Sequence, residues 1–221
     1  MNGMVGFNPQ EAIRFIIEIR DLYTNKSGDQ YKYMTEVVYE TWAKTWYAPK
    51  SLEVWHEITD YYVINLYSCD IVALTFGVYH RVKEAFNSWV QATQSYNAFS
   101  FPAEPEHPNV SFHNFPLEAR EDGFRGIITE NVPTLLNQLK IWQGNMIDVI
   151  NQFDMCISAH SDMFLGSNQM ENFREDVSSA RTRINQIVEK ITDMINKEIE
   201  GTAEAYTETA QANATRFSSG N

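Results

Sequence analysis

The sequence predicts an all-α protein in which two long antiparallel helical hairpins form an elongated four-helix bundle. Apolar residues recur at steps of three and four over long stretches, which is the spacing of one face of an α-helix. Four of the seven prolines lie in one central segment, so the stretches on either side contain few helix breakers. One short pattern also occurs twice at a constant offset, which predicts a duplicated unit. A chain of 221 residues can bury a core as one large domain or as two small ones.

The first helix is predicted to begin at Asn8 and Pro9. Asparagine is a preferred N-cap, and proline is favoured at the first helical position. The polar segment 25–30 contains a glycine and is predicted to break or bend the helix. Apolar residues at helical spacing lie before that segment (Ile13, Ile16, Ile17 and Ile19) and after it (Tyr31, Met34, Val38, Trp42 and Thr45).

The second helix is predicted to run from Ser51 to about Phe99 as one continuous element. Pro49 is expected to end the preceding helix, and Ser51 is expected to cap this one. Residues 61–79 are rich in β-branched and aromatic types and resemble a strand locally. Strands usually stop within about ten residues, however, and no turn signal interrupts this stretch. The expected inward positions are Val54, Ile58, Tyr61, Leu66, Cys69, Ala73, Phe76, Phe86 and Trp89.

A proline-rich linker is predicted at 100–130, between a first hairpin at 8–99 and a second hairpin at 131–217. Prolines at 102, 105, 108 and 116 prevent the helix from continuing through this segment. Its aromatic residues indicate that it packs on the helices: Phe101, Phe112, Phe115 and Phe124.

The second hairpin is predicted to start at Asn131 and Pro133 and to turn at Gly166. Asn168 and Glu171 have the spacing of a capping box for the last helix. The expected seam of the third helix is Leu135, Leu139, Trp142, Met146, Val149, Phe153, Ile157 and Phe164. That of the last helix is Phe173, Val177, Ala180, Ile184, Ile187, Ile191 and Met194.

The repeated pattern occupies 46–55 and 164–173, at an offset of 118 residues. In each copy a large aromatic residue is followed two places later by a small residue and then, after a polar run, by an apolar residue, a glutamate and a second aromatic. The turn residues are Trp46 and Ala48 in the first copy and Phe164 and Gly166 in the second. We therefore expect two related hairpins in one chain.

Composition excludes several classes of function. The net charge is −12 and the basic residues are scattered, which argues against binding to nucleic acid or to an anionic membrane surface. The most apolar stretch is interrupted by Asn65 and Asp70, so we expect no membrane span. The N-terminus lacks the pattern of a Sec signal peptide. Cys69 and Cys156 are expected to be buried free thiols, and a disulfide between them is left open.

No motif in the sequence predicts a metal site or a cofactor. The sequence around His56 begins like a zinc motif, but Asp60 stands where the second histidine ligand belongs. Glu53 and His56 have the spacing of a di-iron site, yet the second copy carries Glu171 and Arg174 at the equivalent positions, and an arginine repels a metal.

Catalytic residues are not predicted either, and we expect that the protein is not an enzyme. His160 lacks a nucleophile elbow nearby and is expected at the edge of a helix seam. No glycine-rich phosphate loop occurs. Four tryptophans, namely Trp42, Trp55, Trp89 and Trp142, are assigned to the core, whereas Trp46 is left open between the core and a binding groove.

Helix, aromatic-x-small turn, helix and acidic charge together resemble the WXG (Trp-X-Gly) superfamily of type VII secretion proteins. Trp46-Tyr47-Ala48 keeps the tryptophan of the family's turn, and Phe164-Leu165-Gly166 keeps its glycine. Family members are single hairpins that usually associate as dimers. The resemblance therefore implies a tandem, single-chain version of that dimer, covering about 8–99 and 131–217.

The resemblance implies a non-enzymatic secreted substrate or adaptor of a bacterial type VII system, exported without a Sec signal. Its partners would be proteins, such as the secretion machinery or a co-secreted protein, and the chain would be a monomeric pseudo-dimer. The family's export signal, Tyr followed four places later by Asp or Glu, is missing, because Tyr206 is followed by Ala210.

The tail after Gly201, with Tyr206 and Phe217, is instead the candidate recognition segment, either as a helical extension or as a frayed terminus. The alternative interpretation is a cytoplasmic or phage-type scaffold, also helical and non-catalytic, that self-assembles along its seams.

Overall fold

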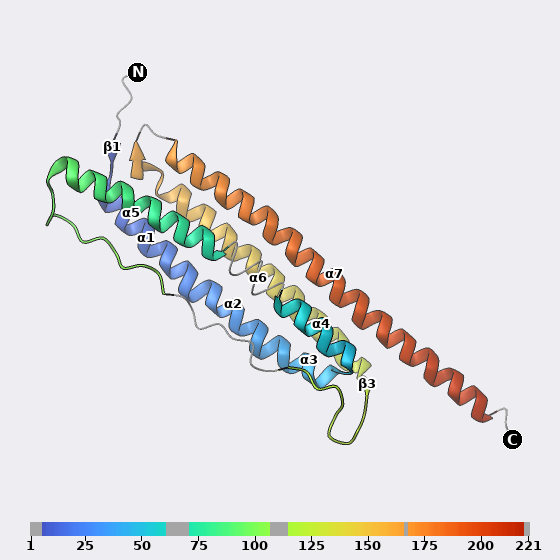
Figure 1. Cartoon of the computed structure of the whole chain (residues 1–221). Coiled ribbons are helices and arrows are strands. Elements are labelled where there is room, and N and C mark those ends of the chain that lie inside the picture. The colour runs from blue at the N-terminus through green and yellow to red at the C-terminus, as the bar shows by residue number, and fades with distance from the viewer. Residues whose placement is uncertain (1–5, 61–70, 107–114, 166–167, 219–221) are drawn as a thin grey trace. The chain divides into compact units, whose positions relative to one another are not determined.

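The computed structural model describes residues 6–60, 71–106, 115–165 and 168–218, and it confirms the all-α class (Figure 1). Within these residues each strand is only two residues long: β1 (Gly6–Phe7), β2 (Trp46–Tyr47), β3 (Gly126–Ile127) and β4 (Phe164–Leu165). The helical elements are α1 (Pro9–Asp21), η1 (Leu22–Ser27), α2 (Gly28–Lys32), η2 (Tyr33–Val38), α3 (Tyr39–Thr45), α4 (Pro49–Asp60), α5 (Ala73–Thr93), η4 (Thr129–Asn131), α6 (Val132–Ala159), η5 (Ser161–Met163) and α7 (Gln169–Ser218). In the described part of the chain, no helix is both long enough and apolar enough to cross a bilayer.

The chain divides into two compact units. Unit 1 consists of Met1–Tyr31, Val63–Val110 and Gly144–Gln186, and unit 2 of Lys32–Tyr62, Ser111–Gln143 and Ile187–Asn221. Each unit therefore takes segments from both predicted hairpins. The division into domains at 8–99, 100–130 and 131–217 remains a prediction.

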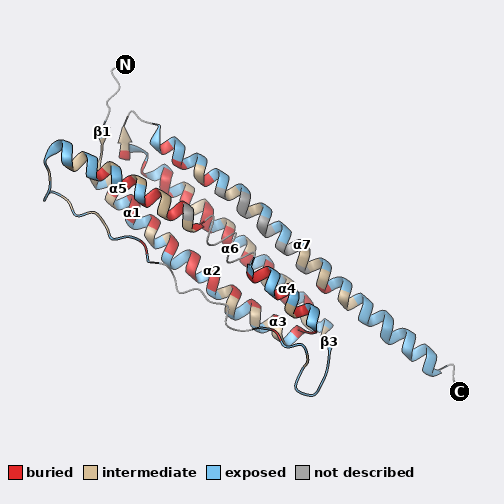
Figure 2. Cartoon of the chain, in the orientation of Figure 1, coloured by how far each residue is buried: buried red, intermediate tan, exposed pale blue. Residues whose placement is uncertain are grey.

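The core of unit 1 is built from one face of each of its helices (Figure 2). Removing a large apolar side chain from water stabilises the fold by about 1.5–3 kcal/mol. The side chains of this core that are almost completely buried include Phe15, Ile16 and Ile19 of α1, Val78 and Val82 of α5, Phe153 and Ile157 of α6, and Phe173 and Val177 of α7.

The core of unit 2 is rich in tryptophan. The centroid of the Trp42 ring lies 5.8 Å from that of Trp46 and 5.3 Å from that of Trp55. In both pairs the two ring planes are tilted relative to each other. Leu135, Leu139 and Trp142 of α6 are also buried in this unit. The expected core positions of Trp42, Trp55 and Trp142 are confirmed, and Trp46 belongs to the core as well. Trp89, which was assigned to the core, is only half-buried.

The first helix begins as predicted but does not break where predicted. The Asn8 side chain caps it by accepting hydrogen bonds from the backbone N–H groups of Gln10 (3.2 Å) and Glu11 (3.3 Å). Residues 25–30 continue the helix through the π-helical element η1 and into α2, and Gly28 is buried. A π-helical turn takes up an extra residue without interrupting the backbone hydrogen bonding, which is why a polar segment did not end the helix.

The limits predicted for the second helix are wrong at both ends. α4 begins at Pro49, so this proline starts the helix instead of ending the previous one, and Ser51 lies inside α4 with its side chain buried. At the other end α5 stops at Thr93, because Gln94 adopts a left-handed conformation with φ 57°. Continuity between α4 and α5 cannot be assigned, since residues 61–70, including Tyr61, Leu66 and Cys69, lie outside the described residues.

The seams of the second hairpin are confirmed in part. In α6 every predicted seam residue from Leu135 to Ile157 is buried. Phe164, predicted as the last seam residue of the third helix, instead lies in β4 and is half-buried, because α6 ends at Ala159. In α7, Phe173 and Val177 are buried and Met194 is half-buried, whereas the side chains of Ala180, Ile184, Ile187 and Ile191 are outside the description.

Candidate functional site

The Trp46 turn is held by a short sheet in unit 2. Its strand β2 pairs antiparallel with β3, with Trp46 opposite Ile127 and Tyr47 opposite Gly126. The pairing is extended by the Ile128 N–H, which donates to the Thr45 carbonyl oxygen at 2.8 Å. Strand β3 lies in the segment predicted as a linker and leads into η4 and α6. The turn of the first predicted hairpin is thus bonded to the start of the second.

The Phe164 turn is held in the same way in unit 1. Strand β4 pairs antiparallel with β1, with Phe164 opposite Phe7 and Leu165 opposite Gly6. The Asn8 N–H donates to the Met163 carbonyl oxygen at 2.9 Å. Because β1 leads directly into α1, the turn of the second predicted hairpin is bonded to the start of the first.

The two junctions correspond residue by residue in the backbone. The accepting residues, Thr45 and Met163, differ by 118 in number, and the donating residues, Asn8 and Ile128, differ by 120. In both, a glycine opens the strand that precedes the helix. We call these the β1–β4 junction and the β2–β3 junction.

The side chains of the junctions differ. Trp46, Tyr47 and Ala48 are all buried, whereas Phe164 and Leu165 are half-buried. The predicted turn residue Gly166 lies outside the described residues. In the β2–β3 junction the Trp42 Nε1–H donates to Ser51 Oγ at 2.8 Å, a buried hydrogen bond that ties α3 to α4.

The candidate recognition segment is helical. α7 continues to Ser218, and nearly all side chains from 201 to 218 are exposed, as the pale blue end of α7 shows in Figure 2. Within it, Tyr206 is 42% exposed and Phe217 is 84% exposed. The segment is therefore a helical extension with two accessible aromatic side chains.

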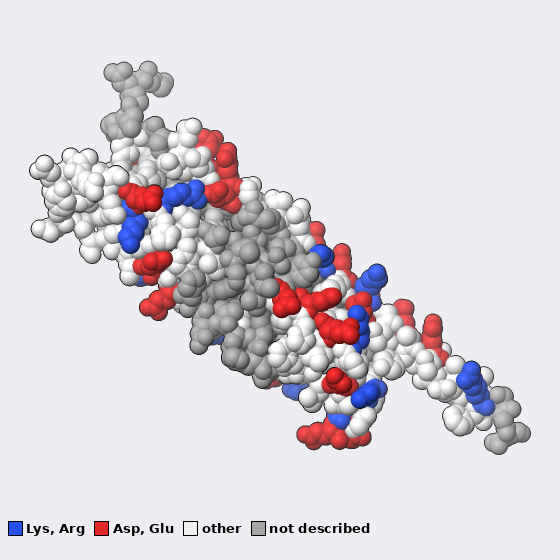
Figure 3. All heavy atoms as spheres, in the orientation of Figure 1, with Lys and Arg blue, Asp and Glu red and all other residues white. Residues whose placement is uncertain are grey.

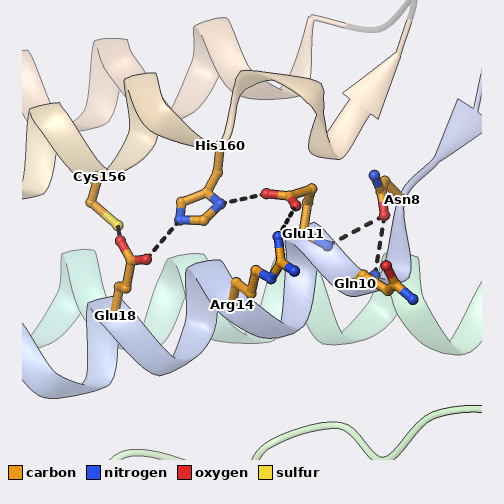
Figure 4. A network of polar contacts seen from close by, with 7 residues as sticks. All are labelled: Asn8, Gln10, Glu11, Arg14, Glu18, Cys156 and His160. Carbon is orange, nitrogen blue, oxygen red and sulfur yellow. Dashed lines mark hydrogen bonds and ion pairs between the residues drawn. The ribbon is translucent and has the colours of Figure 1, made fainter.

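Unit 1 also contains a cluster of polar side chains that was not predicted, formed by Glu11, Glu18, Cys156 and His160 (Figure 4). We call it the polar cluster. Cys156 lies in the last turn of α6, His160 directly follows that helix as the N-cap of η5, and the two glutamates lie on α1. Its centre is His160, whose side chain is only 7% exposed. The His160 ring packs beside Phe15, with 5.7 Å between the ring centroids.

The two nitrogens of His160 face different carboxylates. Nδ1 lies 2.9 Å from Glu11 Oε2, and Nε2 lies 3.2 Å from Glu18 Oε1. Since a carboxylate can only accept a hydrogen bond, Nδ1 carries a proton and donates it to Glu11. The Nε2 atom is buried and makes no hydrogen bond of good geometry.

The environment shifts two pKa values in the cluster. The hydrogen bond from His160, aided by Arg14, lowers the pKa of Glu11. Burial, together with the negative charge of Glu18, raises the pKa of the Cys156 thiol. Cys156 is therefore a protonated thiol in the absence of a cation, and its Sγ lies 3.5 Å from Glu18 Oε2 as a weak donor.

A hollow of about 570 Å³ opens beside the polar cluster. Both Glu18 and Cys156 line it, together with residues of α1, η1 and α6: Ile17, Asp21, Leu22, Gln152, Met155 and Ala159. Ile17 and Met155 are among the exposed large apolar side chains of the chain. Solvent and small ions therefore have access to the cluster from this side.

Elsewhere, the two residues with the spacing of a di-iron motif, Glu53 and His56, are exposed and contact other residues. His56 is exposed and stacks on Phe115, with 4.6 Å between ring centroids. Glu53 is exposed and pairs with Lys50. On the face shown in Figure 3, acidic and basic side chains are interspersed and form no basic patch.

The polar cluster was missed because its two halves are far apart in the sequence. Cys156 and His160 are four residues apart and Glu11 and Glu18 are seven apart, so each pair lies on one helix face. The sequence therefore shows that the members of each pair lie close together, but it does not show that one pair lies next to the other. His160, expected at the edge of a seam, is buried instead.

Comparisons with known proteins leave the family open. No family model matches the chain, no curated protein matches it, and no solved structure matches it.

Proposed function

We propose that this chain is a non-enzymatic helical protein of the WXG type that serves bacterial type VII secretion as a secreted substrate or adaptor. It would act through protein–protein contacts, as a tandem single-chain pair of hairpins arranged as a four-helix bundle. The observation that carries the proposal is the reciprocity of the two junctions. The Trp46 turn is bonded to the start of the second hairpin, and the Phe164 turn to the start of the first.

Reciprocity is what a fused dimer requires. In a dimer with two-fold symmetry, any contact between the turn of one hairpin and the start of the other occurs a second time with the roles exchanged. The β1–β4 and β2–β3 junctions have this relation, down to the matching hydrogen bonds from Asn8 and Ile128. Two unrelated hairpins would have no reason to repeat it.

The exposed end of α7 supports the proposed mode of action. A helix exposed on all sides gains little from tertiary packing, which normally provides most of the stability of a helix. Segment 201–218 nevertheless presents two large aromatic side chains, Tyr206 and Phe217, on a surface that is otherwise made of small and polar residues. Exposed aromatic side chains are favoured anchors of protein interfaces.

Export can be tested in a bacterial strain that has a type VII system, with its secretion ATPase intact or inactivated. We expect the full chain in the medium only when the ATPase is intact. A chain truncated after residue 200 should remain folded, as judged by circular dichroism, but should stay in the cells.

The double variant Tyr206→Ala, Phe217→Ala should be exported less, whereas the matched control Asn213→Ala, which changes an exposed polar residue of the same helix, should be exported normally. Equal amounts in the medium with and without the ATPase would refute the proposal.

The scaffold alternative makes a different prediction for the purified chain. A fused pair of hairpins should be a monomer near 25.5 kDa by light scattering, because its seams are completed within one chain. A scaffold should form larger assemblies that depend on concentration. Assemblies combined with ATPase-independent release would favour the scaffold.

A further inference from the structure

The polar cluster of unit 1 has the ligand atoms and the geometry of a metal site. One ligand atom each from Glu18, Cys156 and His160 lies within 4.8 Å of the other two. In tetrahedral zinc sites the metal–ligand bonds are about 2.0–2.3 Å, which places neighbouring ligand atoms about 3.3–3.7 Å apart. The two oxygens of Glu18 lie close to such distances, with Oε1 3.2 Å from His160 Nε2 and Oε2 3.5 Å from Cys156 Sγ.

His160 is prepared as a metal ligand. In the tautomer whose Nδ1–H donates a hydrogen bond to Glu11, the lone pair on Nε2 is available to a metal. The Nε2 atom is buried, makes no hydrogen bond of good geometry and lies 3.2 Å from Glu18 Oε1, so a cation at this point would contact the imidazole and the carboxylate together. Metal-binding histidines commonly donate their second N–H to a carboxylate, and this is the position of Glu11.

We propose that Glu18, Cys156 and His160 bind a Zn²⁺ ion, with Glu11 as the positioning residue that orients His160. A thiolate, an imidazole and a carboxylate suit Zn²⁺, whereas Mg²⁺ and Ca²⁺ prefer oxygen ligands only. Three protein ligands leave a fourth tetrahedral position. Because Glu18 and Cys156 also line the hollow, a water molecule from the hollow would complete the coordination.

Binding involves the release of one proton. A cysteine thiol is ordinarily protonated at neutral pH, and zinc binds the thiolate, so the thiol proton passes to solvent as the sulfur–zinc bond forms. The affinity for zinc should therefore increase with pH. The positive ion also offsets the charges of Glu18 and the new thiolate, which would otherwise repel each other in a partly buried site.

The site can be tested by calorimetric titration of the purified full chain, stripped with a chelator, with Zn²⁺ alone. We expect one tightly bound ion per chain. With Co²⁺ in place of zinc, we expect the visible absorption of a tetrahedral site and a thiolate-to-metal charge-transfer band. Zinc should also raise the melting temperature of the wild-type chain.

Variants separate this site from adventitious binding. Glu18→Gln and Cys156→Ser should abolish stoichiometric binding, and Cys156→Ser should also remove the charge-transfer band. Glu18 is 55% exposed, so its variant is expected to remain folded without metal, which circular dichroism would verify. Glu11→Gln should keep the one-to-one stoichiometry but weaken the affinity about 10–100-fold, the usual effect of losing a partner of a metal-bound histidine.

Matched controls are available in the same chain. Glu53→Gln and His56→Gln alter a glutamate and a histidine that are also close in sequence but exposed, and Cys69→Ser removes the other cysteine; all three should leave binding unchanged. The proposal is overturned if the wild-type chain binds no zinc, if Glu18→Gln and Cys156→Ser bind it as before, or if Cys69→Ser abolishes binding. None of these results depends on whether the chain is exported.

Discussion

Trp42 lies four residues before strand β2, and His160 lies four residues before strand β4. Both are buried, but one position is occupied by an aromatic indole and the other by a titratable imidazole. In the β2–β3 junction the indole of Trp42 packs against two more indoles, and its N–H is satisfied by Ser51. In the β1–β4 junction the imidazole of His160 lies between two carboxylates. The position four residues earlier shows the same contrast, with Val38 in one unit and Cys156 in the other.

The contrast indicates that the backbone of the junction does not depend on which residues fill it. Both junctions keep the same strand pairing and the same flanking hydrogen bond. An apolar filling gains stability from burial, whereas a buried polar filling gains little unless each group has a partner. We infer that the tryptophan-filled junction carries stability and that the histidine-containing junction is the one open to a ligand.

We expect the largest difference in stability between the two junctions when the aromatic residue of each turn is removed. Trp46→Ala removes a completely buried indole and should lower the free energy of unfolding by about 3–5 kcal/mol. Phe164→Ala removes a half-buried ring, and we expect a loss below about 2 kcal/mol. Urea unfolding followed by circular dichroism would measure both. Equal losses would show that the two junctions contribute alike to stability.

A smaller effect is expected from the buried hydrogen bond of the tryptophan-filled junction. Ser51→Ala would leave the Trp42 Nε1–H without its acceptor, at a cost of about 1–3 kcal/mol in unfolding free energy. Lys50→Ala, one residue earlier, removes an exposed pair with Glu53 and should cost less than about 1 kcal/mol. In a Trp42→Phe background, the further change Ser51→Ala should cost much less. If Ser51→Ala lowers the unfolding free energy just as much in that background, the effect of Ser51 comes from a contact other than its hydrogen bond with Trp42.

The strand glycines offer a third comparison, since Gly6 and Gly126 occupy matching places. Gly126 has φ +151°, and a Cβ added there would lie 3.1 Å from the Phe124 Cζ atom, whereas a Cβ on Gly6 would meet no atom of the described residues within 4 Å. Gly126→Ala should therefore destabilise the protein by about 1 kcal/mol or more, while Gly6→Ala should be neutral or stabilising by up to about 1 kcal/mol. Thermal unfolding of the two variants, run side by side, is the measurement. A stabilising effect of Gly126→Ala would contradict the backbone conformation described here.

The helices of this fold could be predicted from the sequence, because their signals are local. Steps of three and four identified the seam from Leu135 to Ile157, and the Asn8–Pro9 pair identified the start of α1. The ends of helices were less predictable. Gln94 ends α5 in a left-handed conformation that its residue type does not favour, and the helix continues through η1 and α2 across a polar segment that was expected to break or bend it.

The junctions and the polar cluster could not be predicted, because they depend on pairings across long stretches of chain. Strands of two residues are too short to show the alternation that identifies a strand. Trp46 pairs with Ile127 and Phe7 pairs with Phe164 across long stretches of chain that contain whole helices. Glu11 and His160 come together in the same way, across 149 residues. The repeated turn pattern located one half of each junction, and the other half lay in segments assigned to a linker and to an N-terminus.

The smallest expected effect is a dependence of stability on pH that arises in the loop leading to β3. Asp122 accepts hydrogen bonds from the Arg120 guanidinium (3.0 Å to Nε) and from the Phe124 N–H (3.1 Å), and these partners lower the pKa of its carboxyl from 3.8 to about 2. Because the folded pKa is below the unfolded one, the stabilisation is present above pH about 4 and is lost as the pH falls towards about 2. The carboxyl is exposed to solvent, so the effect on melting temperature should be slight. Asp122→Asn should melt at a lower temperature than the wild type at pH about 5, and the two curves should converge at pH about 2. A difference that stays constant over this range would mean that the charge of the Asp122 carboxylate does not hold the loop that leads to β3.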